Sequence, residues 1–233
     1  MKVRIKFSKH GPVRFVGHLD MMRYFQKAIR RADLDIVYTK GFSPHQVLSF
    51  AQPLGVGLES DGEYFDIELN SKTNSKDIVK RLNNTMADGV TILSAVELPE
   101  NAGNAMASVA AAKYQICFRE GCKYPGDLEK DFMEFMNSDT ITVTKQTKKS
   151  EIILDLKPSI FAYQVLSDRF YFLVDASSAG NIKPTLIVDA FYRDKGLQLG
   201  EFDLLITRID TYGKMEDNER VTYKPLEEFG SEF

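Results

Sequence analysis

The stretch KVRIKFS, residues 2–8, alternates apolar and basic side chains, a pattern typical of a half-buried strand. After a Gly-Pro break, HLDMMRYFQKAIRRAD at residues 18–33 changes to helical periodicity. Its apolar side chains collect on one face of the helix, and Arg23, Lys27 and Arg30 collect on the opposite face. A strand followed by an amphipathic helix predicts that helices pack on a sheet, as in the α+β class.

The rest of the N-terminal part predicts further strands and a second helix. These segments are strands at 34–39 and 64–69, a helix at 75–86 and a closing strand at 90–98, and a further short strand at 47–50 is expected inside the loop between the first two. Ser75 is expected to cap the second helix. The order β-α-β-β-α-β is that of the split ferredoxin-like unit.

The C-terminal part shows a similar order of elements without a repeated sequence. Its predicted elements are a strand at 114–119, a helix at 126–137, strands at 141–145 and 151–156, a hairpin at 161–175, a helix at 184–192 and a strand at 202–212. We therefore expect an α+β protein of two tandem ferredoxin-like units, at 1–98 and 113–213. A connector at 99–112, with a short alanine-rich helix at 105–112, joins the units, and a frayed polar tail covers 214–233.

Composition excludes several classes of protein. The chain is 43% hydrophobic and 27% charged, and it has no apolar run long enough for a membrane span. Basic residues interrupt the N-terminus, which therefore does not read as a signal peptide. The two cysteines, Cys117 and Cys122, are expected to be reduced thiols of a cytoplasmic protein. No phosphate loop, dinucleotide fingerprint or cysteine cluster is present, so no cofactor is expected.

Positive charge is concentrated near the N-terminus. Residues 1–45 contain ten Lys and Arg against three acids, although the whole chain has a net charge of −3. This asymmetry indicates a surface that faces a polyanion, unless the charges serve only solubility. The candidate RNA-binding residues are Arg14, Arg23, Lys27, Arg30, Arg31, Lys40, Phe42 and His45.

The stretch YTKGFSPHQVLSFAQPLGVGLES, residues 38–60, is rich in glycine and proline, which predicts a sharply bent loop. Phe42 and Phe50 in this loop could stack on bases, but phenylalanine is more often buried in the core. We expect a binding loop, with catalysis by His45 as an alternative.

All three histidines lie in the basic segment, and their role is open at this point. Paired histidines would suit acid–base cleavage of RNA, for which His18, Asp20 and His45 are the catalytic candidates. A metal site would draw on His10, His18, Asp20 and His45, although their spacing is irregular. The histidines could also bind phosphate, hydrogen-bond to the loop backbone or be purely structural.

Five short motifs in the first 70 residues carry a resemblance to a known family. They are His18-Leu19-Asp20, the segment 28–32, Gly41 to His45, Leu54 to Ser60 and Glu63 to Ile67. This stretch resembles the radical-SAM-linked family, a bacterial domain of unknown function. Ser43 and Gln46 depart from the Asn and the second Pro that are usual in that family's loop. The resemblance implies a radical-SAM protein as partner, and that partner would carry the iron–sulfur cluster.

These observations lead to one functional expectation and two alternatives. We expect an accessory module that binds tRNA or rRNA and acts with a separate radical-SAM enzyme, without catalysis of its own. One alternative is a histidine-dependent RNA-processing or metal-dependent enzyme. The other is a domain that docks the radical-SAM partner through protein contacts. No membrane association is expected.

Overall fold

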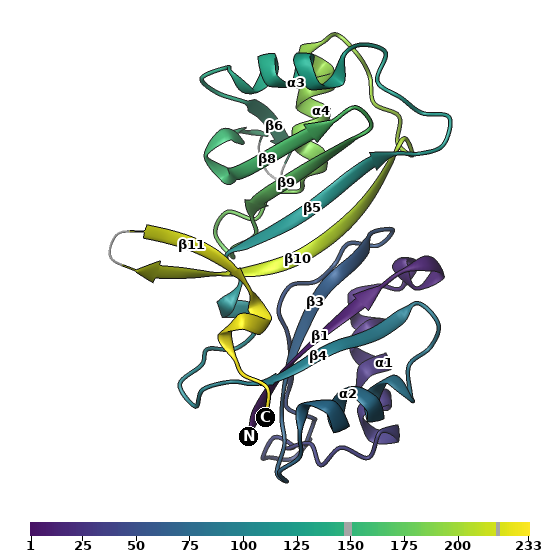
Figure 1. Cartoon of the computed structure of the whole chain (residues 1–233), viewed down its shortest axis with the longest axis vertical. Helices are drawn as coiled ribbons and strands as arrows, with labels where there is room; N and C mark the ends of the chain where they lie inside the picture. Colours follow the sequence, from purple (N-terminus) through teal and green to yellow (C-terminus); the bar gives the residue numbers. More distant parts are fainter. Residues whose placement is uncertain (147–150, 218–219) are drawn as a thin grey trace. The chain divides into compact units, whose positions relative to one another are not determined.

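The computed structural model describes residues 1–146, 151–217 and 220–233, which form two compact units. Unit 1 comprises Met1–Ala110 and Arg208–Phe233, and unit 2 comprises Ala111–Thr207 (Figure 1). The strands pair mainly in antiparallel fashion, and the described residues include four α-helices. The predicted α+β class is therefore confirmed.

Unit 1 opens with the order β-α-β-β-α-β. Its elements are β1 (Lys2–Lys9), α1 (His18–Arg31), β2 (Leu48–Phe50), β3 (Glu59–Glu68), α2 (Ser75–Asn83) and β4 (Val90–Glu97), with the 3-10 helix η1 (Gly11–Phe15) after β1. Strand β1 pairs with both β4 and β3, and β2 adds to β3, all antiparallel. The N-cap of α2 is Asn74 rather than the predicted Ser75, because the Asn74 side chain accepts from the Asp77 amide at 2.9 Å.

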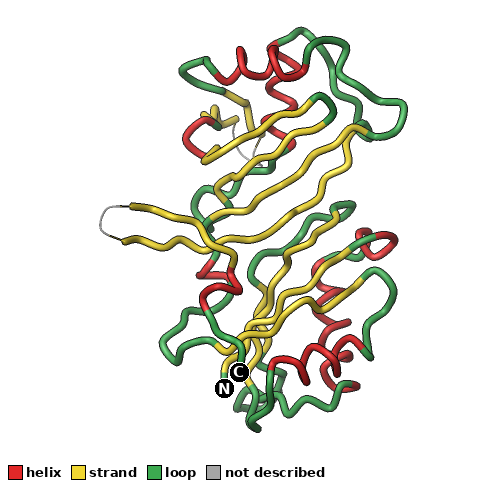
Figure 2. The backbone as a smooth tube through the Cα atoms, in the orientation of Figure 1, coloured by secondary structure: helices red, strands yellow, loops and turns green. Residues whose placement is uncertain are grey.

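One face of this sheet forms the core of unit 1. Helices α1 and α2 cover the face, as Figure 2 shows, and bury their apolar stripes against Val3, Ile5 and Phe7 of β1. The rings of Phe7 and Phe25 pack edge to face with centroids 4.7 Å apart. The alternation of β1 therefore directs its apolar residues to the helices, as predicted.

The opposite face of β1 is buried rather than solvated. Arg4 is 2% exposed and forms an ion pair with Asp66 at 2.8 Å, and Lys6 contacts Asp210 and Glu227, each at 2.7 Å. Their partners include the C-terminal segment, which comprises β10 (Leu204–Asp217), β11 (Arg220–Pro225) and the 3-10 helix η4 (Leu226–Phe229). β10 begins in unit 2 and continues into unit 1. Buried charges of this kind need their partners, since an isolated charge is costly to desolvate.

Unit 2 contains a three-strand antiparallel arrangement, two helices and a separate hairpin. Its elements are β5 (Ala111–Phe118), α3 (Leu128–Met136), β6 (Thr142–Gln146), β7 (Glu151–Asp155), the 3-10 helix η3 (Lys157–Ser159), β8 (Ile160–Leu166), β9 (Arg169–Asp175) and α4 (Thr185–Asp194). The strand order is β5-β9-β8, and β6 pairs with β7 in a separate sheet. Phe132 of α3 and Phe191 of α4 pack at 5.1 Å, which joins the two helices through their apolar faces.

Three predicted segments differ from the structure. Residues 34–39 form no regular strand. They contain only isolated bridges at Ile36 and Tyr38, because the chain turns back on itself directly after them, at residues 40–43. The alanine-rich segment is not a helix over 105–112: a 3-10 turn η2 (Met106–Ser108) precedes β5, whose fully buried alanines fit the sheet despite their helix propensity. The expected tail instead contains the end of β10, β11 and η4, since its residues pair with one another and with β1.

None of the helices that the structure describes combines the length and the hydrophobicity of a membrane span.

Candidate nucleic-acid interface

The glycine- and proline-containing loop begins with a small hairpin. Val47 donates from its amide to the carbonyl of Val37 at 2.8 Å, and Thr39 donates to the carbonyl of His45 at 2.8 Å. At the turn, Gly41 has a φ of +124°, in the region that favours glycine. We call residues 37–47 the hairpin loop. These two backbone hydrogen bonds close the hairpin, and the residues of its tip, 40–44, are exposed.

The tip exposes its side chains, and the two loop phenylalanines have different environments. Phe42 at the tip is fully exposed, whereas Phe50 in β2 is buried against Phe25 and Phe65. Core packing therefore explains Phe50 but not Phe42. Lys40 and His45 are also exposed, so the tip combines an aromatic ring with a cation and an imidazole.

The outer face of α1 carries the predicted cations. Arg23, Lys27 and Arg30 are exposed, and Arg23 contacts the equally exposed Asp20 at 3.4 Å. Neither Lys27 nor Arg30 has a carboxylate at ion-pair distance within the described residues. Arg31 is exposed as well and donates to the carbonyl of Thr85 at 3.0 Å. The helix therefore presents positive charge that is mostly uncompensated.

Helix α1 and the hairpin loop meet at one backbone oxygen. The Gln26 carbonyl accepts from Arg30 Nε at 3.3 Å and from Gln46 Nε2 at 3.2 Å. A pocket opens beside this junction, lined by Gln26, Arg30, Tyr38, Pro44, His45 and Gln46. The structure thus brings together two features that the sequence identifies separately, the basic helix face and the loop.

Arg14 lies outside this group. Its guanidinium contacts Glu59 at 3.2 Å and stacks on Phe15 at 4.9 Å, and the side chain is partly buried. Glu59 in turn has a pKa below its usual value: hydrogen bonds from the Gly11 amide and His10, with the nearby Arg14 charge, outweigh its burial. The charge of Arg14 is therefore locally compensated, unlike that of Arg30.

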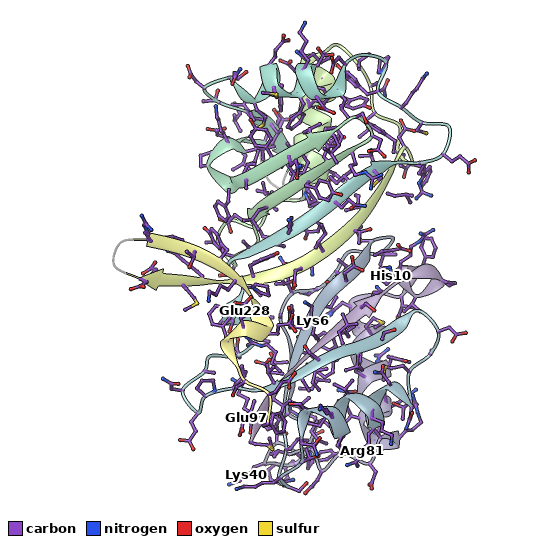
Figure 3. The ribbon with its side chains drawn as sticks, viewed as in Figure 1. Lys6, His10, Lys40, Arg81, Glu97 and Glu228 are labelled. Carbon is purple, nitrogen blue, oxygen red and sulfur yellow. The ribbon has the colours of Figure 1, made fainter. Side chains whose placement is uncertain are left out.

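The three histidines have separate sets of contacts. His10 contacts Asp61 at 2.8 Å and Glu59 at 3.4 Å, whereas His45 contacts Thr39 Oγ1 at 3.1 Å. The His18 ring packs edge-on against Phe50 at 5.3 Å. In Figure 3, His10 and Lys40, which marks the hairpin loop, lie at opposite ends of unit 1.

The structure does not group these histidines into a metal site. Within the described residues, no cluster of three or more His, Cys, Asp or Glu side chains is arranged to hold a metal ion. The carboxylate of Asp20 contacts Arg23 rather than a histidine. The candidate ligands, which are irregularly spaced in the sequence, therefore lie at separate positions in the structure.

Sequence reasoning missed a buried polar group beside His18. Lys9 is buried, donates to the Val16 carbonyl at 2.7 Å and has a pKa lowered by burial. Glu63 is also buried and contacts Arg208 at 2.9 Å, and burial raises its pKa. Together with His18 they line or adjoin a pocket with room for about one water molecule. The sequence could have indicated the burial of Lys9, because Lys9 continues the alternation that places Val3, Ile5 and Phe7 in the core.

Burial lowers the pKa of His18, and the positive charge of Lys9 lowers it further. The neutral form of the ring is therefore favoured, and the ring packs against Phe50 at the edge of the core. A neutral imidazole could accept a proton, but the adjoining pocket is too small for a nucleotide.

The arrangement best suited to a large ligand is thus the outer face of α1 together with the hairpin loop. It has uncompensated cations, an exposed phenylalanine and a lined pocket, all in unit 1. Such a surface can bind a polyanion by charge and hold rings by stacking. We call this surface the α1–loop surface, defined by Arg23, Lys27, Arg30, Arg31, Tyr38, Lys40, Phe42 and His45.

Comparison with known proteins places the chain in a family. A family model described as "Uncharacterized protein conserved in bacteria (DUF2344)" matches residues 2–184, which include the whole α1–loop surface. A search of curated proteins gives no match. Because the match covers most of the chain, the protein belongs to this bacterial family of unknown function.

Proposed function

We propose that this protein is an accessory RNA-binding module, for tRNA or rRNA, that acts with a separate radical-SAM enzyme. The observation that carries the proposal is the joining of α1 and the hairpin loop at the Gln26 carbonyl. Lys27 and Arg30 lie on the helix side of this junction without a carboxylate partner in the described residues, and the fully exposed Phe42 lies at the tip of the loop. The α1–loop surface would contact the RNA, and catalysis would belong to the partner.

The physical chemistry of this surface favours a nucleic acid over a small anion. Arg23, Lys27 and Arg30 follow one another at helical spacing, so their charges can follow successive phosphates of a backbone. Binding would release counterions from the RNA, which makes affinity depend on salt. Phe42 would add base stacking, which tolerates any sequence because every base has a π face.

The radical-SAM partner and the detailed fold are also part of the proposal. The partner follows from the sequence resemblance over the first 70 residues, and it would carry the iron–sulfur chemistry. We further propose that both units are ferredoxin-like. In unit 1, the element order and the strand order β4-β1-β3-β2 support this assignment.

Fluorescence anisotropy with labelled tRNA and rRNA fragments tests the proposal. Wild-type protein should bind, and the double variant Arg23→Glu/Lys27→Glu should bind much more weakly. The matched control is Lys76→Glu/Lys80→Glu, which reverses two exposed charges at the same spacing on α2. Equal loss in both double variants, or no binding by the wild type, would contradict RNA binding through α1.

A second candidate function is docking of the radical-SAM partner through apolar contacts. Phe15, Leu19 and Val56 are each more than 60% exposed. The hydrogen bond from the Gly57 amide to the Arg14 carbonyl, at 2.9 Å, holds the Val56 loop against η1. Coexpression with the partner tests this function: Leu19→Asp and Val56→Asp should prevent co-purification, and retention of the partner by both variants would contradict docking at this patch.

A further inference from the structure

We propose that the pocket between α1 and the hairpin loop holds a single unstacked nucleotide, so that the protein prefers single-stranded RNA to duplex. This inference rests on the proposed RNA binding and names the form of RNA that the surface accepts. The pocket has a volume of about 190 Å³ and opens to solvent. It is smaller than the sites of about 300–1,000 Å³ that enclose whole small molecules, so it would hold part of one nucleotide, with the rest at its open mouth.

Arg30 is placed to bind the phosphate. Its Nε is occupied by the Gln26 carbonyl, which ties the guanidinium to its own helix. The two terminal nitrogens have no partner among the described residues, and the side chain is exposed. A guanidinium held at one nitrogen offers its other donors to a phosphate with little further loss of side-chain freedom.

His45 is oriented by its neighbours. Its amide donates to Thr39 Oγ1 at 3.1 Å, and its Nδ1 lies 3.1 Å from the same hydroxyl and 3.4 Å from the Ser43 carbonyl. These contacts leave Nε2 without a partner in the described part of the chain. Nε2 is thus the imidazole atom available for a phosphate or a ribose hydroxyl.

Tyr38 and Pro44 supply the surface for a base. Tyr38 is 47% exposed and forms an isolated bridge with Gln46, so its backbone is fixed while its ring remains accessible. Pro44 lines the same pocket. A base that leaves its helical stack can pack on an aromatic ring, and such a contact strengthens binding by about fivefold or more.

Gln46 provides an unmet hydrogen-bond acceptor in the pocket wall. The residue is 6% exposed, and its Nε2 donates to Gln26, which sets the orientation of the amide. Its Oε1 is buried and has no donor among the described residues. A buried acceptor without a partner is unfavourable, because no hydrogen bond compensates for the loss of water around it. An amino group of a base could supply the donor once the hairpin loop shifts to admit it.

The test compares one labelled RNA strand alone and in a duplex of equal length, by fluorescence anisotropy. Wild type should bind the single strand more tightly. Tyr38→Ala should weaken single-strand binding by about tenfold, the size expected for one lost stack, and leave duplex binding unchanged. Tyr38→Phe, which keeps the ring, should behave as wild type.

Equal affinity of wild type for both RNA forms, or an equal effect of Tyr38→Ala on both, would overturn the pocket while RNA binding stands. No binding of either form would overturn the proposed function as well.

A second measurement follows the amides of His45 and Gln46 by NMR during titration with adenosine monophosphate, ribose 5-phosphate and inorganic phosphate. The nucleotide should bind at least about fivefold more tightly than ribose 5-phosphate, the lower bound for stacking. Equal binding of inorganic phosphate would overturn a nucleotide site.

Discussion

Gln46 in the hairpin loop donates a hydrogen bond to the backbone carbonyl of Gln26 in α1 at 3.2 Å, although the two residues are twenty positions apart. Through this bond the loop is held beside the basic face of the helix. The same carbonyl accepts from Arg30, so one oxygen positions both a loop residue and a cation. The α1–loop surface therefore depends on a contact that neither segment makes alone.

Replacing Gln46 with leucine should separate binding from stability. The variant loses the bond to Gln26 but also removes the unpaired Oε1, so the melting temperature should change little. RNA affinity should fall because the hairpin loop is no longer held at α1. Thermal unfolding and anisotropy measure the two effects, and unchanged affinity would show that the junction is irrelevant to binding.

Phe42 and Phe50 offer a matched pair of substitutions. Phe42→Ala should leave the free energy of unfolding unchanged, because the ring is fully exposed, and should weaken RNA binding by about tenfold through lost stacking. Phe50→Ala should destabilise the fold by about 3–5 kcal/mol, as for other buried phenylalanines. Chemical denaturation gives the free energy of unfolding of each variant, and fluorescence anisotropy gives the RNA affinity. A destabilised Phe42→Ala variant would disagree with the exposed position of the ring.

His18 should make stability depend on pH. Its pKa in the folded protein lies below the unfolded value of about 6.5. Its contribution is therefore fully present above about pH 6.5 and is lost as the pH falls through the folded pKa. His18→Gln should remove this part of the pH dependence, with His10 and His45 common to both proteins. Urea denaturation from pH 5 to 8 provides the comparison, and parallel curves for the two proteins would contradict the shift.

The buried pair of Arg4 and Asp66 should show strong coupling. Asp66→Asn leaves a buried guanidinium without its counter-charge, which should cost about 3–5 kcal/mol. The double variant Arg4→Met/Asp66→Leu should recover much of this loss, since an apolar pair needs no compensation. A double-mutant cycle of Arg4→Met, Asp66→Leu and the double variant, followed by denaturation, measures the coupling, and simple additivity of these two single changes would refute it.

The fold class follows from periodicity that is local in the sequence. Alternation over 2–8 and the apolar stripe of α1 both predict the elements that the structure contains. The sequence predicts strands at both 34–39 and 47–50 and cannot choose between them, because the two segments have equal strand character. Only the pairing with β3 selects residues 48–50 as the strand β2. Similarly, the burial of Arg4 depends on a C-terminal segment more than 200 residues away, which no local pattern reveals.

The candidate site shows the same limit. Exposed cations on α1 can be predicted from helical spacing alone. Their meeting with the hairpin loop cannot, because it depends on the tertiary bond between Gln46 and Gln26. A site shared by the three histidines could not be judged from the sequence. Their closeness in the sequence says nothing about the separate contacts that His10, His18 and His45 make.

The most direct test of RNA binding through α1 is the salt dependence of affinity, with the logarithm of the binding constant plotted against the logarithm of salt concentration. Wild type and the Lys76→Glu/Lys80→Glu control should give the same steep negative slope. For Arg23→Glu/Lys27→Glu, two lost phosphate contacts should reduce the slope by about 1.4 on a single strand. A wild-type affinity that does not change with salt, or an unchanged slope in the α1 variant, would contradict the proposed function.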